Sequence, residues 1–357
     1  MKKVSTILFA AISVASISVA SISSVQAKEK RILLKMPIYY NSNLPGLGSP
    51  AKYLEDNASI LSGGTIKVKM YEPKKLVAPG EILDAVSSGK VQAGYGTPAN
   101  WGGKIPAARL FSAVPFGPEA PEYLAWIMYG NGAKLHQDLY DKKGYNVKTQ
   151  VCGIIAPETS GWFKKEIKSA DDLKGLKMRF FGLGAEVMEK LGVSTVGLPG
   201  GEIFPALEKG AIDATEFSMP AVDKRIGVSK IAKYNYYPGW HQQATVMELL
   251  INKDTWKEMS KTQKAVMTQL CRAATLDSLA LGEAIQAPIM RENEANGVKN
   301  IYWSTEMLDL FESKWDEVVI EQAAEDADFA EIWADLSKFR ADYLLWETNA
   351  FLPRGTK

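Results

Sequence analysis

The sequence contains few residues suited to covalent or transition-metal chemistry. It has two cysteines, Cys152 and Cys271, and two histidines, His136 and His241. No C-x-x-C pair occurs, which argues against thiol redox chemistry and structural zinc, and two histidines are too few for a multi-histidine metal centre. The cysteines are far apart in the chain. An oxidising compartment would permit a disulfide between them, but the sequence does not show whether they meet.

The chain also lacks an excess of charge of one sign. It carries 42 lysines and arginines against 41 aspartates and glutamates, a formal net charge of +1. Such a balance gives no reason to expect a broad surface for nucleic acid or membrane. No G-x-S-x-G motif and no carboxylate pair with acid–base partners stands out, so we expect a binding protein and not an enzyme.

Long hydrophobic runs are confined to the first residues. Lys2 and Lys3 precede an apolar stretch over residues 4–22, and Val25-Gln26-Ala27 fits a small-x-Ala cleavage site. This layout is typical of a secretory signal peptide, residues 1–27, with a membrane anchor as the alternative. No later segment approaches the ~20 apolar residues of a spanning helix. We therefore expect a nearly neutral mature protein of about 330 residues in the periplasm.

Strands and helices alternate through most of the mature chain. In its first part we predict strands over residues 32–38, 65–70 and 91–95, and helices over 51–61 and from 79 to Gly89. In the middle we predict strands over 147–155, 177–181 and 211–216, a capped turn at 169–173, and helices over 185–191 and 205–209. This order is typical of mostly parallel sheets with helices on their faces.

Two such α/β units joined by crossovers predict the two-lobe fold of a periplasmic binding protein, with a cleft between the lobes. We expect the first part of lobe I in residues 28–150 and most of lobe II in 151–238. Residues 239–357 would supply a crossover strand and long C-terminal helices that span both lobes: one from Ser260 to about 293, interrupted at Pro288, one after Ser304, and one over 329–351. Ligands bind such sheets at the carboxyl ends of the strands.

Arg179 is the first candidate for a binding residue, since it lies near the carboxyl end of a predicted apolar strand. A buried guanidinium needs an anionic partner, and its planar fork matches a carboxylate in two parallel hydrogen bonds. The alternative is a structural salt bridge. The following turn, Gly182 to Val187, resembles G-x-G-x-x-G, but a valine replaces the last glycine. We interpret it as a tight turn near a bound anion and not as a dinucleotide site.

Two glutamates are candidates for holding a cation beside that anion. Glu216 also ends a predicted strand, and Glu158 precedes a small polar run. Hard cations such as sodium and calcium take carboxylate and carbonyl oxygens. The alternatives are a pairing of Glu216 with Arg179 and a solvated Glu158. After a Pro-Gly turn, the segment Trp240-His241-Gln242 could also point into the cleft, although structural roles compete there.

Three segments carry a family resemblance that covers essentially the whole mature chain. They are residues 172–179 (DLKGLKMR), 197–214 (GLPGGEIFPALEKGAIDA) and 236–241 (YYPGWH). With these segments the chain resembles the solute-binding proteins of tripartite ATP-independent periplasmic (TRAP) transporters, the DctP-type family. Within it, the chain is most similar to the branch that binds 2-oxo acids and other monocarboxylates. The resemblance implies two α/β lobes, a long helix across both, delivery of the ligand to membrane permease subunits, and a homodimer through the C-terminal helices.

The resemblance also implies roles for individual residues. Arg179 matches the arginine that binds the ligand carboxylate. Glu158, Glu216 and the backbone carbonyl of Phe217 match the positions that hold a bridging metal cation, calcium or sodium.

Other substrate-binding candidates are less direct. Asn100 or Trp101 matches a polar ligand contact, and Trp240, His241 and Gln242 complete the candidate set.

Two positions depart from the 2-oxo acid binders of this branch, which have glutamine at the position of Glu158 and tryptophan at that of Phe217. A second carboxylate favours a divalent ion, calcium, over sodium. Alternatively, Glu158 accepts a ligand hydroxyl, which would favour a 2-hydroxy acid such as lactate over pyruvate. A different function, presentation of the ligand to a periplasmic sensor or chemoreceptor, would use an identical site, and genomic neighbourhood would separate the two.

Overall fold

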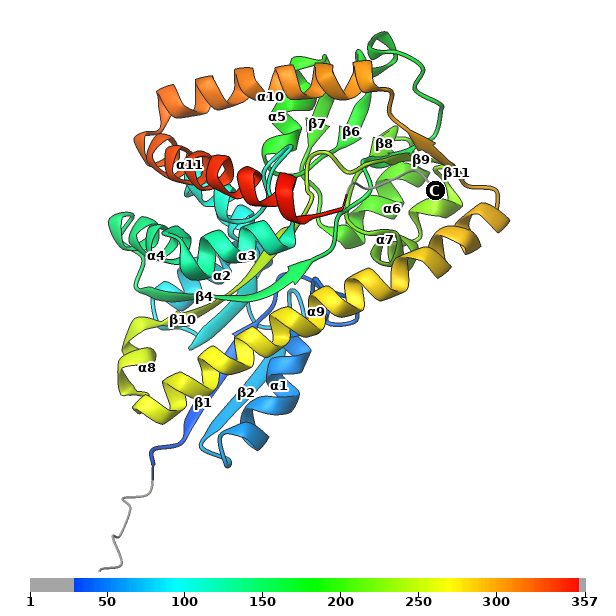
Figure 1. The fold of residues 1–357 in the computed structure, drawn as a ribbon. Helices are drawn as coiled ribbons and strands as arrows, with labels where there is room; N and C mark the ends of the chain where they lie inside the picture. Colours follow the sequence, from blue (N-terminus) through cyan, green and yellow to red (C-terminus); the bar gives the residue numbers. More distant parts are fainter. Residues whose placement is uncertain (1–28, 353–357) are drawn as a thin grey trace, which may run out of the picture.

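A computed structural model describes residues 29–352, so the predicted signal peptide lies outside the described residues. The chain forms two α/β lobes with long helices across them, lobe I around two small sheets and lobe II around one larger sheet (Figure 1). Among the described residues, no helix combines the length and the apolarity that a bilayer crossing requires.

Lobe I contains five strands. Parallel strands β1 (Ile32–Pro37) and β2 (Ile66–Tyr71) pair along their full length. A parallel bridge from Ile38 to Tyr95 connects them to a second sheet, whose strands are β3 (Ala93–Gly96), β10 (Thr245–Asn252) and β4 (Val147–Ile155).

The expectation of a mostly parallel sheet is wrong for this second sheet. Strand β10 lies between β3 and β4 and is antiparallel to both. All eight of its residues are buried, as befits a central strand. The chain enters β10 on its way back from lobe II to lobe I. The local alternation of apolar and polar residues cannot reveal such a long-range pairing. The predicted lobe boundary after residue 150 falls inside β4, and the lobe boundaries stay a prediction.

Lobe II contains one mixed sheet of six short strands in the order β11-β9-β5-β8-β6-β7. Their bounds are β5 (Gly161–Phe163), β6 (Lys177–Arg179), β7 (Ser194–Val196), β8 (Ala214–Thr215), β9 (Tyr234–Tyr237) and β11 (Lys299–Tyr302). Strands β8, β6 and β7 are parallel to one another, whereas β5 is antiparallel to both its neighbours.

Eight shorter helices cover the sheets and their edges: α1 (Ser49–Leu61), α2 (Ile82–Ser87), α3 (Ala120–Tyr129), α4 (Gly132–Lys142), α5 (Leu183–Lys190), α6 (Gly200–Glu208), α7 (Pro220–Ile226) and α8 (Lys253–Glu258). Short 3-10 turns include Pro98–Trp101, Pro106–Phe111 and Ala170–Leu173. Helix α6 begins at Gly200 and not at residue 205, where the sequence pattern placed it.

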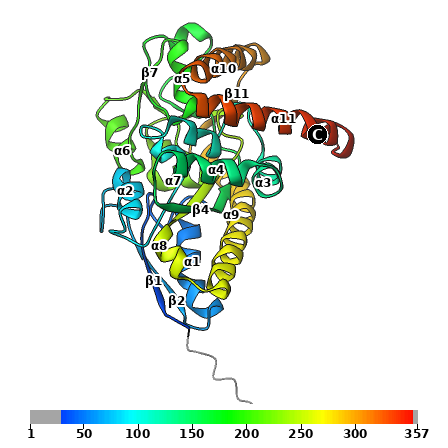
Figure 2. The same cartoon turned by 90° about the vertical axis from the view of Figure 1, so that its left-hand side faces the viewer.

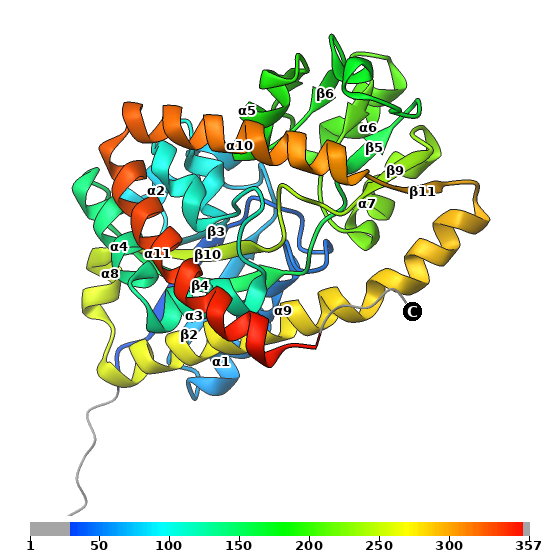
Figure 3. The same ribbon diagram turned by 45° about the horizontal axis from the view of Figure 1, so that its top comes forward.

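Helix α9 (Lys261–Ala295) runs along both lobes. The Ser260 hydroxyl accepts a hydrogen bond from the Gln263 amide and caps its first turn. The predicted interruption at Pro288 is wrong, because the helix continues past it. In Figures 1 and 3, α9 extends from α1 and α8 to the side of α7.

A disulfide between Cys152 and Cys271 joins β4 to α9, with the sulfurs 2.15 Å apart. The pairing that the sequence left open is therefore present. It fastens the spanning helix to the edge strand of the lobe I sheet.

The last two helices also connect the lobes. Helix α10 (Thr305–Glu325) packs on α5 of lobe II, and α11 (Ala327–Ala350) packs on α3, α4 and the Pro106–Phe111 turn of lobe I. Figure 3 shows α10 crossing from one lobe to the other.

Candidate functional site

Two neighbouring parallel strands bring Arg179 and Glu216 together at their carboxyl ends. Arg179 ends β6 and pairs in register with Thr215 of β8, which Glu216 follows directly. Arg179 Nη1 donates to Glu216 Oε1 and to the Glu216 carbonyl, both at 2.7 Å, and Nε donates to the Leu198 carbonyl at 3.2 Å. Both side chains are buried. The salt bridge that the sequence left open as an alternative is therefore present.

The Arg179 fork nevertheless keeps one nitrogen available. Its Nη2 forms no hydrogen bond with any residue that the structure describes. The guanidinium lies 5.2 Å from the Phe217 ring centroid and 5.6 Å from that of Phe181, positions that stabilise a cation. In this conformation a ligand carboxylate would contact Nη2 alone, and not two nitrogens in parallel.

Glu158 lies in the loop between β4 and β5 and is 4% exposed, so the alternative of a solvated loop residue is wrong. Its amide donates to the Gln242 carbonyl at 3.2 Å. With the Gln242 side-chain nitrogen turned toward it, Glu158 Oε1 accepts a hydrogen bond of 3.2 Å. His241 Nε2 lies 3.6 Å from Glu158 Oε2 and 3.7 Å from Glu216 Oε2.

Burial and charge together set the protonation of this cluster. Burial raises the pKa of Glu158 to about 7, and the nearby Glu216 charge adds to the rise. Burial would also raise the pKa of Glu216, but the Arg179 charge and the contact with His241 together outweigh it and hold that pKa below its usual range. Burial lowers the pKa of His241, yet the two carboxylates bring it to about 9.

The same cluster fits a hard cation. Oxygens of Glu158 and Glu216 and a nitrogen of His241 lie within 4.8 Å of one another. Glu216 Oε2 is buried and has no hydrogen-bond partner among residues 29–352, and no described residue donates to the carbonyl of Phe217. Two carboxylates and a carbonyl are the donors that calcium and sodium prefer.

A cavity of about 420 Å³ lies between the lobes and reaches the cluster at Phe217, whose ring lines it, whereas Arg179, Glu158, Glu216 and His241 do not. Lobe I contributes Tyr39 and Tyr40, which directly follow the first lobe I strand, and lobe II contributes Phe217. Asn100 Nδ2 donates to the Tyr40 hydroxyl at 3.1 Å. Asn100 therefore does not line the cavity itself but contacts a tyrosine that does. Burial raises the pKa of Tyr40, which keeps its hydroxyl protonated and able to donate.

The family model for bacterial extracellular solute-binding proteins, family 7 (DctP), matches residues 41–326. The chain belongs to this family. A curated relative, the monocarboxylate 2-oxoacid-binding periplasmic protein of Nostoc sp., is 33% identical over 91% of this chain and 88% of its own length.

Solved structures of TRAP solute-binding proteins share the fold of this DctP protein. One from Bordetella bronchiseptica, a mixed-occupancy dimer with calcium and picolinate, has a TM-score of 0.87 and 31% identity, covering 90% of this chain and 95% of that one. One from Pseudoalteromonas atlantica, with sodium and pyruvate, has a TM-score of 0.85 and 29% identity, covering 90% of this chain and 97% of that one. One from Colwellia psychrerythraea, with calcium and pyruvate, has a TM-score of 0.85 and 30% identity, covering 90% of this chain and 98% of that one. The DctP family is a family of transport proteins and not of enzymes.

Two of the predicted site residues of this DctP protein lie in the core instead. The Trp101 indole is 1% exposed and donates to Glu248 Oε1 at 2.5 Å. The Trp240 ring stacks 4.8 Å from Phe311 and 5.6 Å from Phe116. Burial of so large an apolar ring is more favourable than a place in a polar cleft, so the turn after Pro238 directs only His241 and Gln242 to the cluster.

Two glycines allow the backbone to approach this cluster closely. A Cβ on Gly239 would lie 2.2 Å from the Glu158 carbonyl oxygen, and one on Gly184 would lie 2.8 Å from the His241 Cβ. The predicted tight turn is present, with φ of +66° at Gly182. Its proximity to a bound anion stays a prediction.

Asp223, at the start of α7, is a positioning residue that the sequence analysis missed. Its carboxylate accepts hydrogen bonds from the Trp162 indole at 2.7 Å and from the Ser218 amide at 3.0 Å. It thereby connects β5, which follows Glu158, to the segment that follows Glu216 and Phe217. Nothing in the local sequence pattern distinguishes this aspartate from an ordinary acidic residue of a first helical turn.

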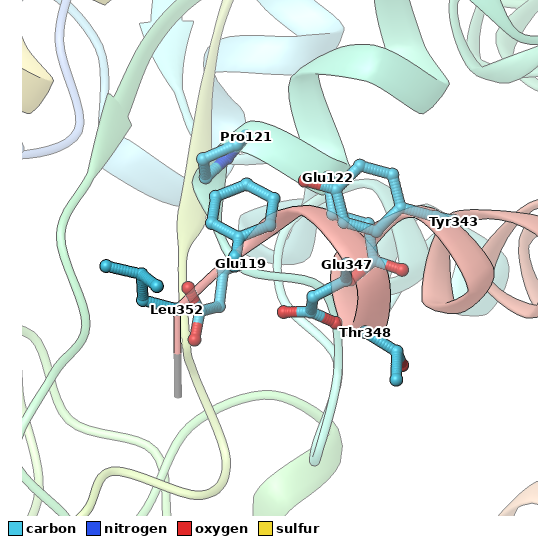
Figure 4. Close-up of a pocket in the computed structure, with 8 residues that line it drawn as sticks. Glu119, Pro121, Glu122, Tyr343, Glu347, Thr348 and Leu352 are labelled. Carbon is cyan, nitrogen blue, oxygen red and sulfur yellow. The ribbon is translucent and has the colours of Figure 1, made fainter. Parts of the chain in front are cut away.

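A second hollow of the DctP protein, about 400 Å³, lies where the end of α11 meets the start of α3. Figure 4 shows the side chains of Glu119, Glu122 and Glu347 around it. Its lining is acidic, so it does not suit an organic anion.

Proposed function

We propose that this protein is the periplasmic subunit of a TRAP transporter that captures a small 2-oxo monocarboxylate, such as pyruvate, together with a cation. The observation that carries this proposal is the free Nη2 of buried Arg179 beside two buried carboxylates. An anion would contact the arginine, and a cation would neutralise the carboxylates. The names of the Nostoc, Pseudoalteromonas and Colwellia proteins support the same ligand class.

Each part of the site has a role in this proposal. Arg179 Nη2 and the Tyr40 hydroxyl donate to the ligand carboxylate, and Asn100 holds the tyrosine in place. Glu158, Glu216 and the Phe217 carbonyl hold the cation, while His241 and Gln242 orient the two glutamates. Two carboxylates favour calcium over sodium.

Closure of the lobes would complete the binding site. Lys74 of lobe I lies 3.3 Å from Glu202 of lobe II, and Arg225 of lobe II donates to the Asn43 carbonyl of lobe I. These contacts hold the rim of the cavity together. Exclusion of water then strengthens the electrostatic contacts inside, and the closed form is the one that docks on the membrane permease.

The C-terminal helices are proposed as the dimer surface. Leu344, Leu345 and Trp346 of α11 are 59–72% exposed, and Figure 2 shows α11 extending beyond the body of the molecule. Exposed apolar side chains in a row need a covering partner. The dimer of the Bordetella protein supports this assignment.

Calorimetry of the mature chain tests the ligand and the cation together. Pyruvate should bind in calcium buffer and lose at least tenfold in affinity after chelation, because the two carboxylates then lack their counter-ion. Unchanged affinity after chelation would remove the cation bridge. Tighter binding of lactate than of pyruvate would assign Glu158 to a ligand hydroxyl and the protein to 2-hydroxy acids.

A further inference from the structure

A separate pocket of about 260 Å³ lies in lobe I, among residues of α3, α4, β4, α8 and α9. It shares no lining residue with the cavity between the lobes. In Figure 1 this region is at the left, where α4 and α8 flank β4 and β10. We call it the back pocket.

The ionisable side chains that line the back pocket are basic. They are Lys148, Arg272 and His136, and no acidic side chain lines it. Neither Lys148 nor Arg272 forms an ion pair with any residue in the described part of the chain. Asp141 acts on Lys148 from a distance, but its carboxylate pairs with Lys253. Two cations in one hollow without a counter-charge leave it suited to an anion.

Unsatisfied polar groups point to the same conclusion. The Gln150 side chain lines the back pocket, and both its amide nitrogen and its oxygen are buried without a hydrogen-bond partner among residues 29–352. Lys148 Nζ has one hydrogen bond, to Gln137 Oε1 at 3.1 Å, and can donate two more. Burial lowers the pKa of Lys148, a cost that a bound anion would reduce. A buried amide with no partner costs free energy unless a ligand or water satisfies it.

Glu248 behind the pocket wall does not provide the missing negative charge. Its Oε1 accepts hydrogen bonds from the Trp101 indole at 2.5 Å and the Tyr140 hydroxyl at 2.8 Å, and its Oε2 lies 3.0 Å from His136 Nε2. This carboxylate is fully buried, and its contacts with Trp101, Tyr140 and His136 leave it outside the pocket lining.

Apart from Thr149 and Thr268, the rest of the wall is apolar and aromatic, with Ile127, Met128, Val151 and Trp256 among its residues. We propose that the back pocket binds a small organic anion with an apolar body, its charged end between Lys148 and Arg272 and its apolar part against Trp256. The volume is slightly below the usual range for ligand pockets, which limits the body to about one ring or a short branched chain.

Benzoate is the probe for this proposal, with acetate as the probe that lacks the apolar body. The cleft is first filled with pyruvate and calcium, and benzoate is then titrated by calorimetry. We expect benzoate to bind at least tenfold more tightly than acetate. We expect Arg272→Gln and Lys148→Met each to lose at least fivefold in benzoate affinity, while Arg179→Met, measured without pyruvate, keeps it.

Three results would overturn the proposal. They are no benzoate binding, equal benzoate binding by Arg272→Gln and the unaltered protein, and loss of benzoate binding in Arg179→Met. The last result would place benzoate in the cleft. Because Arg272 is exposed, its substitution should leave the melting temperature unchanged, which controls for unfolding.

Discussion

At the scale of the residue, the proposed site depends on one guanidinium, that of Arg179, which would divide its hydrogen bonds between protein and ligand. Arg179 Nη1 donates to Glu216 and Nε donates to the Leu198 carbonyl, whereas Nη2 donates to no residue that the structure describes. The ion pair thus positions the arginine and does not compete with the ligand for Nη2. A buried charge without its partner would be costly, and in this pair each charge compensates the other.

Replacement of that arginine tests its role. Arg179→Met should lower pyruvate affinity at least tenfold, because the ligand carboxylate loses its charged donor. Removing one partner of the buried pair also leaves Glu216 uncompensated and should lower the melting temperature. Calorimetry in calcium buffer, on protein shown to be folded by circular dichroism, checks both. Wild-type affinity in the folded variant would exclude Arg179 from the ligand site.

The second carboxylate should decide the choice of cation. Glu158→Gln removes one negative charge but keeps an oxygen that can accept from Gln242. We expect calcium-dependent pyruvate binding to weaken at least tenfold and sodium to support binding about as well as calcium. Pyruvate titrations in the two salts measure this.

Glu208→Gln is the matched control, since it removes one exposed charge from α6 and Glu208 lines neither the cluster nor the cavity between the lobes. An unaltered calcium preference in Glu158→Gln, or an equal change in the control, would contradict a direct role for Glu158.

At the scale of the element, the disulfide joins the spanning helix to the lobe I sheet. Cys152 and Cys271 are separated by 119 residues, so the bond closes a long loop of the unfolded chain. Replacing both cysteines with serine should lower the free energy of unfolding by about 2–5 kcal/mol. Urea unfolding with and without reductant checks this, and equal stability of the oxidised protein and the double variant would contradict it.

The start of α11 makes a pH-dependent contact with lobe I. Asp328 lies between Lys142 and Lys143 of the α4 region. Burial alone would raise its pKa, but the two lysines lower it below its usual range. The contribution of this contact is therefore present above the unfolded-state pKa and is lost as pH falls through the lower folded-state value.

Asp328→Asn should thus destabilise the protein by about 0.5–1 kcal/mol at pH 7 and by clearly less at pH 3. Urea unfolding of both proteins at the two pH values measures the difference. A difference in stability that stays constant with pH would contradict this prediction, because the contribution of the charge must disappear as Asp328 is protonated.

At the scale of the whole molecule, the cavity lies between two lobes that several long elements connect. The β4–β5 loop, the β9–β10 segment, α9 and α10 all pass from one lobe to the other, so opening must bend them together. Pyruvate with calcium should reduce the radius of gyration in small-angle scattering. Chelated protein with pyruvate should remain as open as the protein alone, because the uncompensated carboxylates keep the ligand out.

The sequence by itself determined the α/β class, the long C-terminal helices and the family, since alternation, caps such as Ser260 and the segments around Arg179 are local in the chain. It also predicted Arg179, Glu158, Glu216, His241 and Gln242 as site residues, and the structure brings these five together. Only the tertiary structure decided that Arg179 and Glu216 pair, that Cys152 meets Cys271 and that Trp101 and Trp240 enter the core. Those outcomes depend on which segments become neighbours after the chain passes repeatedly between the lobes, and no local pattern encodes such neighbours.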